Sequence, residues 1–121
     1  METGILRVFL GAEDFEQSLG FYRALGFECD WQSEDLAELS LGANHFYLQR
    51  YYQAEWCNNT MLHLSVADPQ AWFDKAREVL TAGSWGQARV APPQRQDYGA
   101  LVTFLWDPSG ILWHFAAFDQ P

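Results

Sequence analysis

Asp107-Pro108-Ser109-Gly110 stands between two apolar, aromatic runs, Leu101–Trp106 and Ile111–Phe115. Turn-forming residues between two such runs predict a tight β-hairpin. The hairpin is informative about the fold because the chain contains the same order of secondary-structure elements twice, and the hairpin belongs to the second copy. Asp107-Pro108-Ser109-Gly110 therefore closes the second of two similar units.

The first unit begins with a β-type run at Ile5–Leu10. Asp14 then offers a helix N-cap, with Gln17 three residues later as in a capping box. Apolar residues at helical spacing follow, and Gly26 ends the predicted helix. That apolar face consists of Phe15, Leu19, Tyr22 and Leu25. The three short strands expected next are Phe27–Trp31, Leu36–Leu41 and His45–Tyr51.

The second unit repeats this order from Met61–Val66 onward. Asp68 repeats the cap, and Pro69 occupies the first helical position. The buried stripe expected of this helix is Trp72, Phe73, Ala76, Val79 and Leu80. After the stop at Gly83 we expect a weak strand at Arg89–Ala91, a polar loop from Pro92 to Gly99, and strands Leu101–Trp106 and Ile111–Phe118.

The order β-α-β-β-β, found twice, predicts an α+β fold. Its two βαβββ repeats are expected to form curved mixed sheets around a cleft, with the helices on the outer faces. Each half is too small to be stable alone, so we expect a single domain over 1–121. Repeat one spans about 4–52 and repeat two about 60–119.

The charge balance limits the partners. A net charge of −9, from 7 basic and 16 acidic residues, repels phosphate backbones, so nucleic acid is not an expected partner. We expect no membrane partner, because no window of about 18 apolar residues exists.

Two features favour a cytoplasmic location with reduced thiols. The chain lacks a signal segment, and its two cysteines, Cys29 and Cys57, do not have the spacing of metal ligands.

The aromatic content is high, with 6 Trp, 5 Tyr and 9 Phe. An acidic field combined with aromatic faces suits a flat or cationic small-molecule ligand. The simpler alternative is that acidity maintains solubility and that the aromatics build the core. The acidic cluster Glu34, Asp35 and Glu38 reads as a solvated turn, or else as the rim of a cation site.

Three segments carry a family resemblance: Ser18-Leu19-Gly20-Phe21-Tyr22 with Leu25-Gly26-Phe27, then His63-Leu64-Ser65-Val66-Ala67-Asp68, then Asp107-Pro108-Ser109-Gly110. Together they resemble the vicinal-oxygen-chelate superfamily, which includes glyoxalase I, extradiol dioxygenases, and fosfomycin and bleomycin resistance proteins. The resemblance covers essentially the whole chain. It says little about function, since the superfamily spans several reaction types.

The resemblance implies metal-ligand positions on four strands. They fall on Arg7, Met61, His114, and Gln49 (or Tyr47 if the register shifts). Only His114 is a good ligand, and the fixed charge of Arg7 opposes a nearby cation. We therefore expect no metal and no cofactor at these positions. A relocated divalent metal site at His63, His114 and His45 is the alternative.

A chain that keeps the fold but lacks the family's metal ligands resembles the bleomycin resistance branch of the superfamily. Those proteins bind a bulky, cationic, aromatic glycopeptide without transforming it, and a second subunit completes their cleft. The resemblance thus implies a homodimeric, antibiotic-resistance type of binding protein rather than an enzyme, with no catalytic residue identified. The alternatives are a metal-dependent lyase, isomerase or dioxygenase with displaced ligands, and a structural dimer with a vestigial pocket.

Strand alternation predicts which side chains face the cleft. The candidate ligand-binding residues are Phe9, His45, Tyr47, Gln49, His63, Phe104, Trp106 and His114. Phe104, Trp106 and Tyr47 are expected to stack on the ligand, and His114, His63 and Gln49 to give polar contacts. Val102 and Ala116 share the predicted face. Core filling by the aromatics, and burial of the histidines in ordinary hydrogen bonds, are the competing interpretations.

Overall fold

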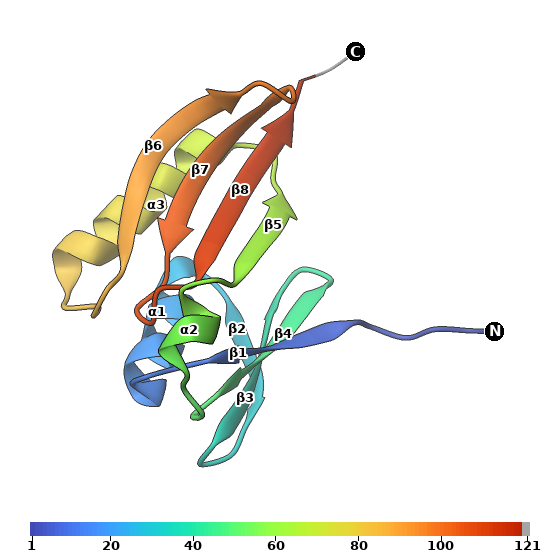
Figure 1. The fold of residues 1–121 in the computed structure, drawn as a ribbon, viewed down its shortest axis with the longest axis vertical. Helices are drawn as coiled ribbons and strands as arrows, with labels where there is room; N and C mark the ends of the chain where they lie inside the picture. Colours follow the sequence, from blue (N-terminus) through green and yellow to red (C-terminus); the bar gives the residue numbers. More distant parts are fainter. Residues whose placement is uncertain (120–121) are drawn as a thin grey trace.

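A computed structural model describes residues 1–119, so the last two residues of the expected domain lie outside the described part. Two four-stranded sheets form the framework, with strand orders β1-β4-β3-β2 and β5-β8-β7-β6 (Figure 1). The N-terminal sheet comprises β1 (Arg7–Gly11), β2 (Glu28–Gln32), β3 (Leu36–Leu41) and β4 (Asn44–Gln49). The C-terminal sheet comprises β5 (Met61–Ser65), β6 (Arg89–Gln96), β7 (Ala100–Trp106) and β8 (Leu112–Phe118). The helices are α1 (Phe15–Leu25), α2 (Ala54–Cys57) and α3 (Pro69–Ala82).

The two halves share one topology, which confirms the predicted α+β fold of two βαβββ repeats. In each half the first strand pairs in parallel with the last: Arg7 lies opposite His45, and Met61 opposite Leu112. The remaining pairs are antiparallel, so both sheets are mixed. The sheets remain open rather than closing into a barrel.

The helix caps follow the sequence closely. Asp14 Oδ1 accepts from the Gln17 amide at 3.0 Å, and Asp68 Oδ1 accepts from the Ala71 amide at 3.1 Å. Gly26 ends α1 in the left-handed conformation, with φ 109°. The reciprocal half of the capping box is replaced by a tertiary contact, because Gln17 Nε2 donates to the Ser84 carbonyl at 3.2 Å.

The predicted loop from Pro92 to Gly99 is wrong over most of its length. Strand β6 continues through the prolines to Gln96, with a register shift between Ala91 and Gln94. Proline is tolerated there because β6 is an edge strand, and an edge strand needs only half of its amides for pairing. The short helix α2, in the link between the halves, was also not predicted.

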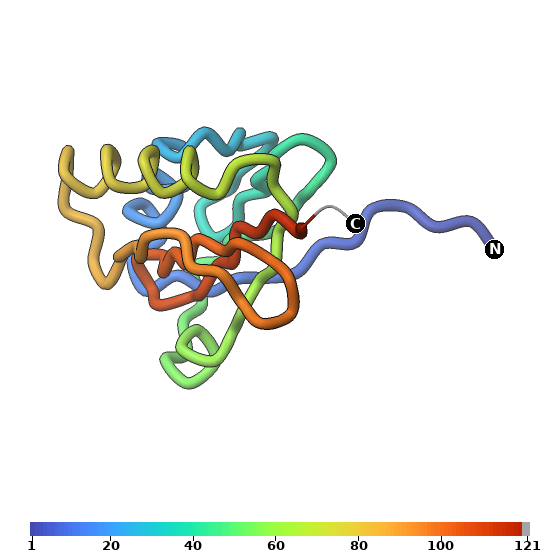
Figure 2. The backbone as a smooth tube through the Cα atoms, turned by 90° about the horizontal axis from the view of Figure 1, so that it is seen from above, coloured from blue at the N-terminus to red at the C-terminus, as the bar shows by residue number. Residues whose placement is uncertain are grey.

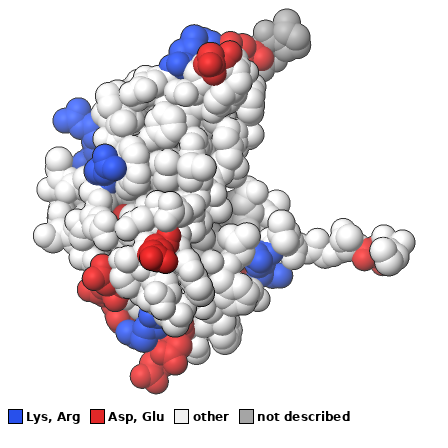
Figure 3. Space-filling model, in the orientation of Figure 1, with Lys and Arg blue, Asp and Glu red and all other residues white. Residues whose placement is uncertain are grey.

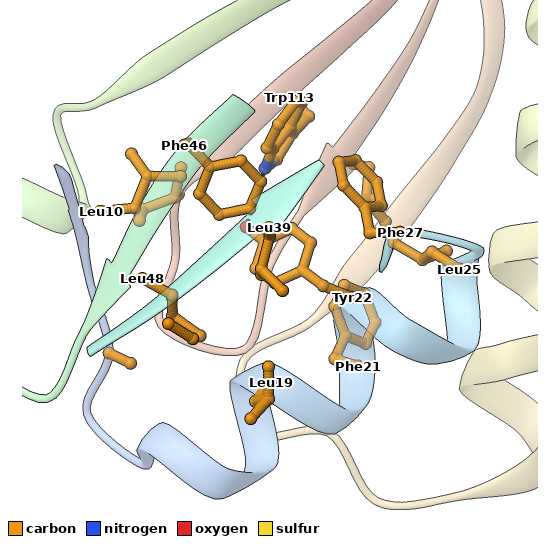
Figure 4. Close-up of a cluster of buried hydrophobic side chains, with 14 of the residues drawn as sticks. Leu10, Leu19, Phe21, Tyr22, Leu25, Phe27, Leu39, Phe46, Leu48 and Trp113 are labelled. Carbon is orange, nitrogen blue, oxygen red and sulfur yellow. Dashed lines mark hydrogen bonds between the residues drawn. The ribbon is translucent and has the colours of Figure 1, made fainter. Parts of the chain in front are cut away.

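An aromatic cluster joins the two halves (Figure 4). The Tyr22 ring lies 5.0 Å from that of Phe46, and Phe27 lies 5.5 Å from Trp113, measured between centroids. Trp113 Nε1 also donates to the Tyr22 hydroxyl at 2.9 Å. Because Tyr22 belongs to the first repeat and Trp113 to the second, the repeats share one core.

The hairpin turn is tied into this core by Asp107, which is fully buried. One carboxylate oxygen accepts from the Ser109 and Ile111 amides at 2.8 and 2.9 Å. The other accepts from the Tyr22 hydroxyl at 2.7 Å. Burial is the largest effect on this carboxyl and raises its pKa to about 6.

Each sheet has one covered and one open face. Helix α3 lies across one face of the C-terminal sheet, and α1 packs on the N-terminal sheet (Figures 1 and 2). The N-terminal residues before β1 extend away from the body in both views. Among the described residues, no helix has the length and apolarity needed to cross a membrane.

Candidate functional site

The open face of the N-terminal sheet carries Phe9, His45, Tyr47 and Gln49. Strand alternation places them there because Leu10, Phe46 and Leu48 point into the core and are buried. The rings of Phe9 and Tyr47 lie 4.9 Å apart, and Phe9 is 58% exposed. Phe9 and Gln49 line a groove of about 520 Å³.

The open face of the C-terminal sheet carries the other candidates, His63, Phe104, Trp106 and His114. The Phe104 ring meets His114 edge-on at 5.0 Å and lies 6.4 Å from Trp106. His63 and His114 are register partners, and their rings are nearly parallel at 5.9 Å. These side chains form one continuous aromatic surface.

Val102 and Ala116 share that face but do not line an accessible surface. Both are fully buried, together with Ala100, in a small apolar cluster packed against Phe104. They therefore lie on the predicted face but add no accessible surface to it. Phe104 covers them while remaining partly exposed itself, so the aromatic surface rests on a packed apolar base.

The tautomer of His114 follows from its contact with the backbone. Its Nδ1 lies 3.1 Å from the Leu62 carbonyl oxygen. A carbonyl oxygen can only accept, so Nδ1 carries the hydrogen. In the neutral ring Nε2 is then an acceptor, available to a ligand N–H or O–H group.

The structure divides the candidates into two groups. Within residues 1–119, no hydrogen bond or ring contact links the group on the N-terminal sheet with the group on the C-terminal sheet. His45 of the first group and His63 of the second both line a pocket of about 140 Å³. One chain therefore presents two separate surfaces rather than a closed cleft.

Two arginines lie over candidate rings. The sequence identifies Arg7 only as a metal-ligand position of the family, and it does not single out Arg89. The Arg89 guanidinium carbon is 3.8 Å from the centroid of the Trp106 ring, and Arg7 is 5.8 Å from that of Tyr47. Cations at such distances are attracted by the aromatic face. The register Arg89↔Trp106 creates the first contact, and predicting it required the pairing of β6 with β7.

Further exposed aromatics extend the surface on the C-terminal sheet. Phe118 lies 5.7 Å from His63, and Tyr98 lies 6.1 Å from Phe118. Phe118 and Tyr98 are each 52% exposed. The alternation from His114 through Ala116 to Phe118 could have identified Phe118 from sequence.

A charged cluster surrounds His45. Its Nδ1 lies 2.9 Å from Glu38 Oε2 and 3.5 Å from Asp30 Oδ2, and Arg7 Nε donates to the same Glu38 oxygen at 2.9 Å. Glu38 therefore does not belong to a solvated turn. It lies within β3, with 17% of its side chain exposed.

The residues at the family's metal positions do not fit a hard divalent metal. Arg7 cannot ligate and is paired with Glu38. Met61 offers a thioether and is 65% exposed, and its register partner is Leu112 rather than His114. A hard divalent ion needs several oxygen or imidazole donors together, and these positions supply only His114 as a good one.

A hollow of about 510 Å³ lies between the C-terminal half of α3 and β6, and Arg89 is one of its lining residues. Phe73, Arg77 and Trp85 are among its lining residues, and none of the candidates is. The surface over the open face of the C-terminal sheet carries few charges, whereas acidic groups gather around α1 and the N-terminal sheet (Figure 3). The aromatic surface and the acidic surface are thus distinct regions.

Two open, mixed sheets built from βαβββ repeats define the class of protein. Residues 4–115 match the model of the Glyoxalase/Bleomycin resistance protein/Dioxygenase superfamily. The chain belongs to this superfamily. The comparison with curated proteins gave no match.

Several solved structures share the fold over nearly the whole chain. A bleomycin-binding protein complexed with bleomycin is 21% identical, with a TM-score of 0.79 over 97% of this chain and 100% of that one. A bleomycin resistance determinant encoded on the transposon Tn5 is 21% identical, with a TM-score of 0.81 over 98% and 100%. The bleomycin-binding protein of Streptomyces verticillus, complexed with copper(II)-bleomycin, is 26% identical, with a TM-score of 0.77 over 98% and 100%.

Proposed function

We propose that this protein binds and sequesters a small cationic or aromatic molecule without transforming it. The observation that carries the proposal is the open aromatic surface of the C-terminal sheet, on a fold shared with bleomycin-binding proteins. Sequestration needs no cofactor, which agrees with the poor donors at the family's metal positions. The two cysteines are unbonded, which suits the reducing cytoplasm.

Planar groups of the ligand would stack on Phe104, Trp106 and Tyr47. Polar contacts would come from His114, His63 and Gln49, with His114 Nε2 accepting a hydrogen bond. Arg89 over Trp106 supports this use of the ring, since the geometry already accommodates a planar cation. A cationic ligand would take over that position or use the opposite face of the ring.

The proposal includes a homodimer. The two groups of candidates lie on separate surfaces of one chain, so a second copy is needed to enclose a ligand. The edge strands β1 and β5 expose large apolar side chains, with Val8 at 39%, Phe9 at 58% and Met61 at 65%. Sedimentation equilibrium tests this, and a monomer at all concentrations would contradict it.

The direct test is a titration with metal-free bleomycin, followed by tryptophan fluorescence. Trp106→Leu is expected to weaken binding by about two- to thirtyfold, because an aromatic or cation–π contact contributes about 0.5–2 kcal/mol. Trp31→Leu is the matched control. Trp31 is 52% exposed on β2, outside the candidate groups.

A panel of cationic and aromatic compounds, screened by thermal shift, covers other ligands. Stoichiometric binding that depends on Trp106 and not on Trp31 supports sequestration. Equal loss in both variants, or no binding by any compound, would contradict the proposal.

A second candidate function is a metal-dependent lyase, isomerase or dioxygenase with displaced ligands. The pairing of His63 with His114, and the hydrogen bond that fixes the His114 tautomer, favour it. His114→Ala should then remove one bound nickel, zinc, manganese or iron(II) ion per chain. A metal content per chain that is unchanged in this variant would rule out His114 as a ligand.

A further inference from the structure

We propose that Asp30, Glu38 and His45 form a binding site for a divalent metal ion of the zinc type. The site lies on the open face of the N-terminal sheet. It uses neither Met61, His114 nor Gln49, and so differs from the ligand positions implied by the superfamily. It is also independent of sequestration, because the ion alone is the ligand.

Three neighbouring strands supply the donors. Glu38 and His45 come from β3 and β4, which pair with Ser40 opposite His45 and Glu38 opposite Tyr47. Both side chains lie on the open face and are only 17% exposed. Two of the donors are therefore fixed by the regular sheet and partly shielded from water.

A β-bulge supplies the third donor. The pairing of β2 with β3 passes from Cys29↔Leu39 directly to Trp31↔Glu38, leaving Asp30 without a partner. A bulge of this kind redirects one side chain and is frequent beside functional sites. Here it brings Asp30 Oδ2 to 3.5 Å from His45 Nδ1.

The donor atoms are spaced for one ion. One donor atom from each residue lies within 4.8 Å of the other two, and His45 Nδ1 is 2.9 Å from Glu38 Oε2. Zinc bonds of about 2.0–2.2 Å place neighbouring tetrahedral ligands roughly 3.4 Å apart. Small side-chain rotations reach this spacing, and Asp30, with 35% of its side chain exposed, has room for them.

The contacts of His45 Nδ1 require either a hydrogen or a metal ion on this nitrogen. An imidazole nitrogen with a bare lone pair would be repelled by two adjacent carboxylates, so a proton or a metal ion must lie between them. A hydrogen on Nδ1 would form its hydrogen bond mainly to the nearer oxygen, that of Glu38. A divalent ion would be coordinated by all three donors at once. One imidazole with two carboxylates is a donor set that zinc accepts.

Arg7 limits the affinity but does not occupy the site. Its Nε donates to Glu38 Oε2, and this contact orients the carboxylate, as the hydrogen-bond partners of metal ligands commonly do. The guanidinium charge opposes a second cation nearby. Removal of this charge should therefore strengthen metal binding, which a purely structural ion-pair cluster would not show.

The experiment uses the full chain, stripped with a chelator and titrated with zinc by calorimetry. We expect one zinc ion per chain. His45→Gln and Glu38→Gln should each weaken binding at least about 100-fold, and Asp30→Asn about tenfold. Arg7→Gln should tighten it by about threefold or more, and Asp35→Asn, which removes an exposed carboxylate paired with Arg50, should leave it unchanged.

Cobalt(II) absorption spectra provide a second measurement that does not depend on the variants. A visible band of tetrahedral intensity in the unmodified protein, displaced by zinc, supports the site. Circular dichroism of each metal-free variant separates loss of ligation from loss of fold. Binding that survives His45→Gln in a folded protein, binding that is lost equally in Asp35→Asn, or no binding at millimolar zinc would each overturn the proposal.

Discussion

At the scale of single residues, Arg89 decides how accessible the best stacking platform is. Its guanidinium carbon lies 3.8 Å from the centroid of Trp106 and so competes with any cationic ligand for that ring. Arg89→Gln should therefore tighten binding of metal-free bleomycin by roughly fivefold, since an exposed cation–π contact contributes about 1 kcal/mol. Fluorescence titration measures the change. Weaker binding would instead assign Arg89 a direct contact with the ligand.

The buried carboxyl of Asp107 gives a second prediction at the same scale. Its folded pKa of about 6 exceeds the ordinary 3.8, so between these values the folded state binds more protons than the unfolded state. Its contribution to the free energy of unfolding should thus fall as pH rises from about 4 to about 6, by about 3 kcal/mol in total.

Asp107→Asn isolates this effect, because the amide keeps an acceptor for the Ser109 and Ile111 amides and does not titrate. Urea unfolding of both proteins across this pH range gives the difference in stability. The deficit of the variant should shrink as pH rises. A deficit that grows with pH would mean that the Tyr22 hydroxyl and the backbone amides hold Asp107 ionised despite burial.

At the scale of elements, the predictions succeeded where the determinants are local. The Asp14 and Asp68 caps and the apolar periodicity locate α1 and α3 within a few residues, and the hairpin at Asp107–Gly110 joins β7 and β8 as expected. These signals depend on residues within a turn or two of one another.

The incorrect or missing predictions concern features that are determined by which strands pair and in which register. Pro92 lies in a strand because β6 is an edge, which the sequence around Pro92 does not reveal. Asp30 reaches His45 only because a bulge interrupts the β2–β3 register. The contact of Arg89 with Trp106 likewise depends on register. Alternation assigned the candidates to the exposed faces of their strands, but the separation of the two faces within one chain required the whole fold.

The hairpin itself allows a controlled stability test. Gly110 has φ 95°, and a Cβ there would collide with Asn58 Oδ1 and approach Gln87 Oε1 at 3.4 Å. Gly110→Ala should cost about 2 kcal/mol, mainly from backbone strain at φ 95°, because the ends of the Asn58 and Gln87 side chains can move aside. Gly42→Ala is the control: it has φ 59° with nothing within 4 Å, so only about 1 kcal/mol is expected. Equal losses would show that the hairpin adapts to the added methyl group.

At the scale of the whole molecule, charge should affect self-association and ligand binding in opposite directions. Each copy carries a net charge of −9, so two copies repel, while the exposed apolar side chains of β1 and β5 favour contact. A cationic ligand is instead attracted by the same field. Added salt screens both effects, because the screening length falls from about 30 Å at 0.01 M to about 3 Å at 1 M.

Raising the salt concentration over this range should therefore strengthen the dimer and weaken capture of a cationic ligand, each by roughly tenfold. Sedimentation equilibrium follows the first quantity. Titration with metal-free bleomycin, at protein concentrations where the dimer is saturated, follows the second. If both affinities fell with salt, the dimer contact would be polar rather than the apolar edges of β1 and β5. If ligand affinity did not change, the acidic field would make no contribution to recognition, and stacking on Phe104 and Trp106 would account for it alone.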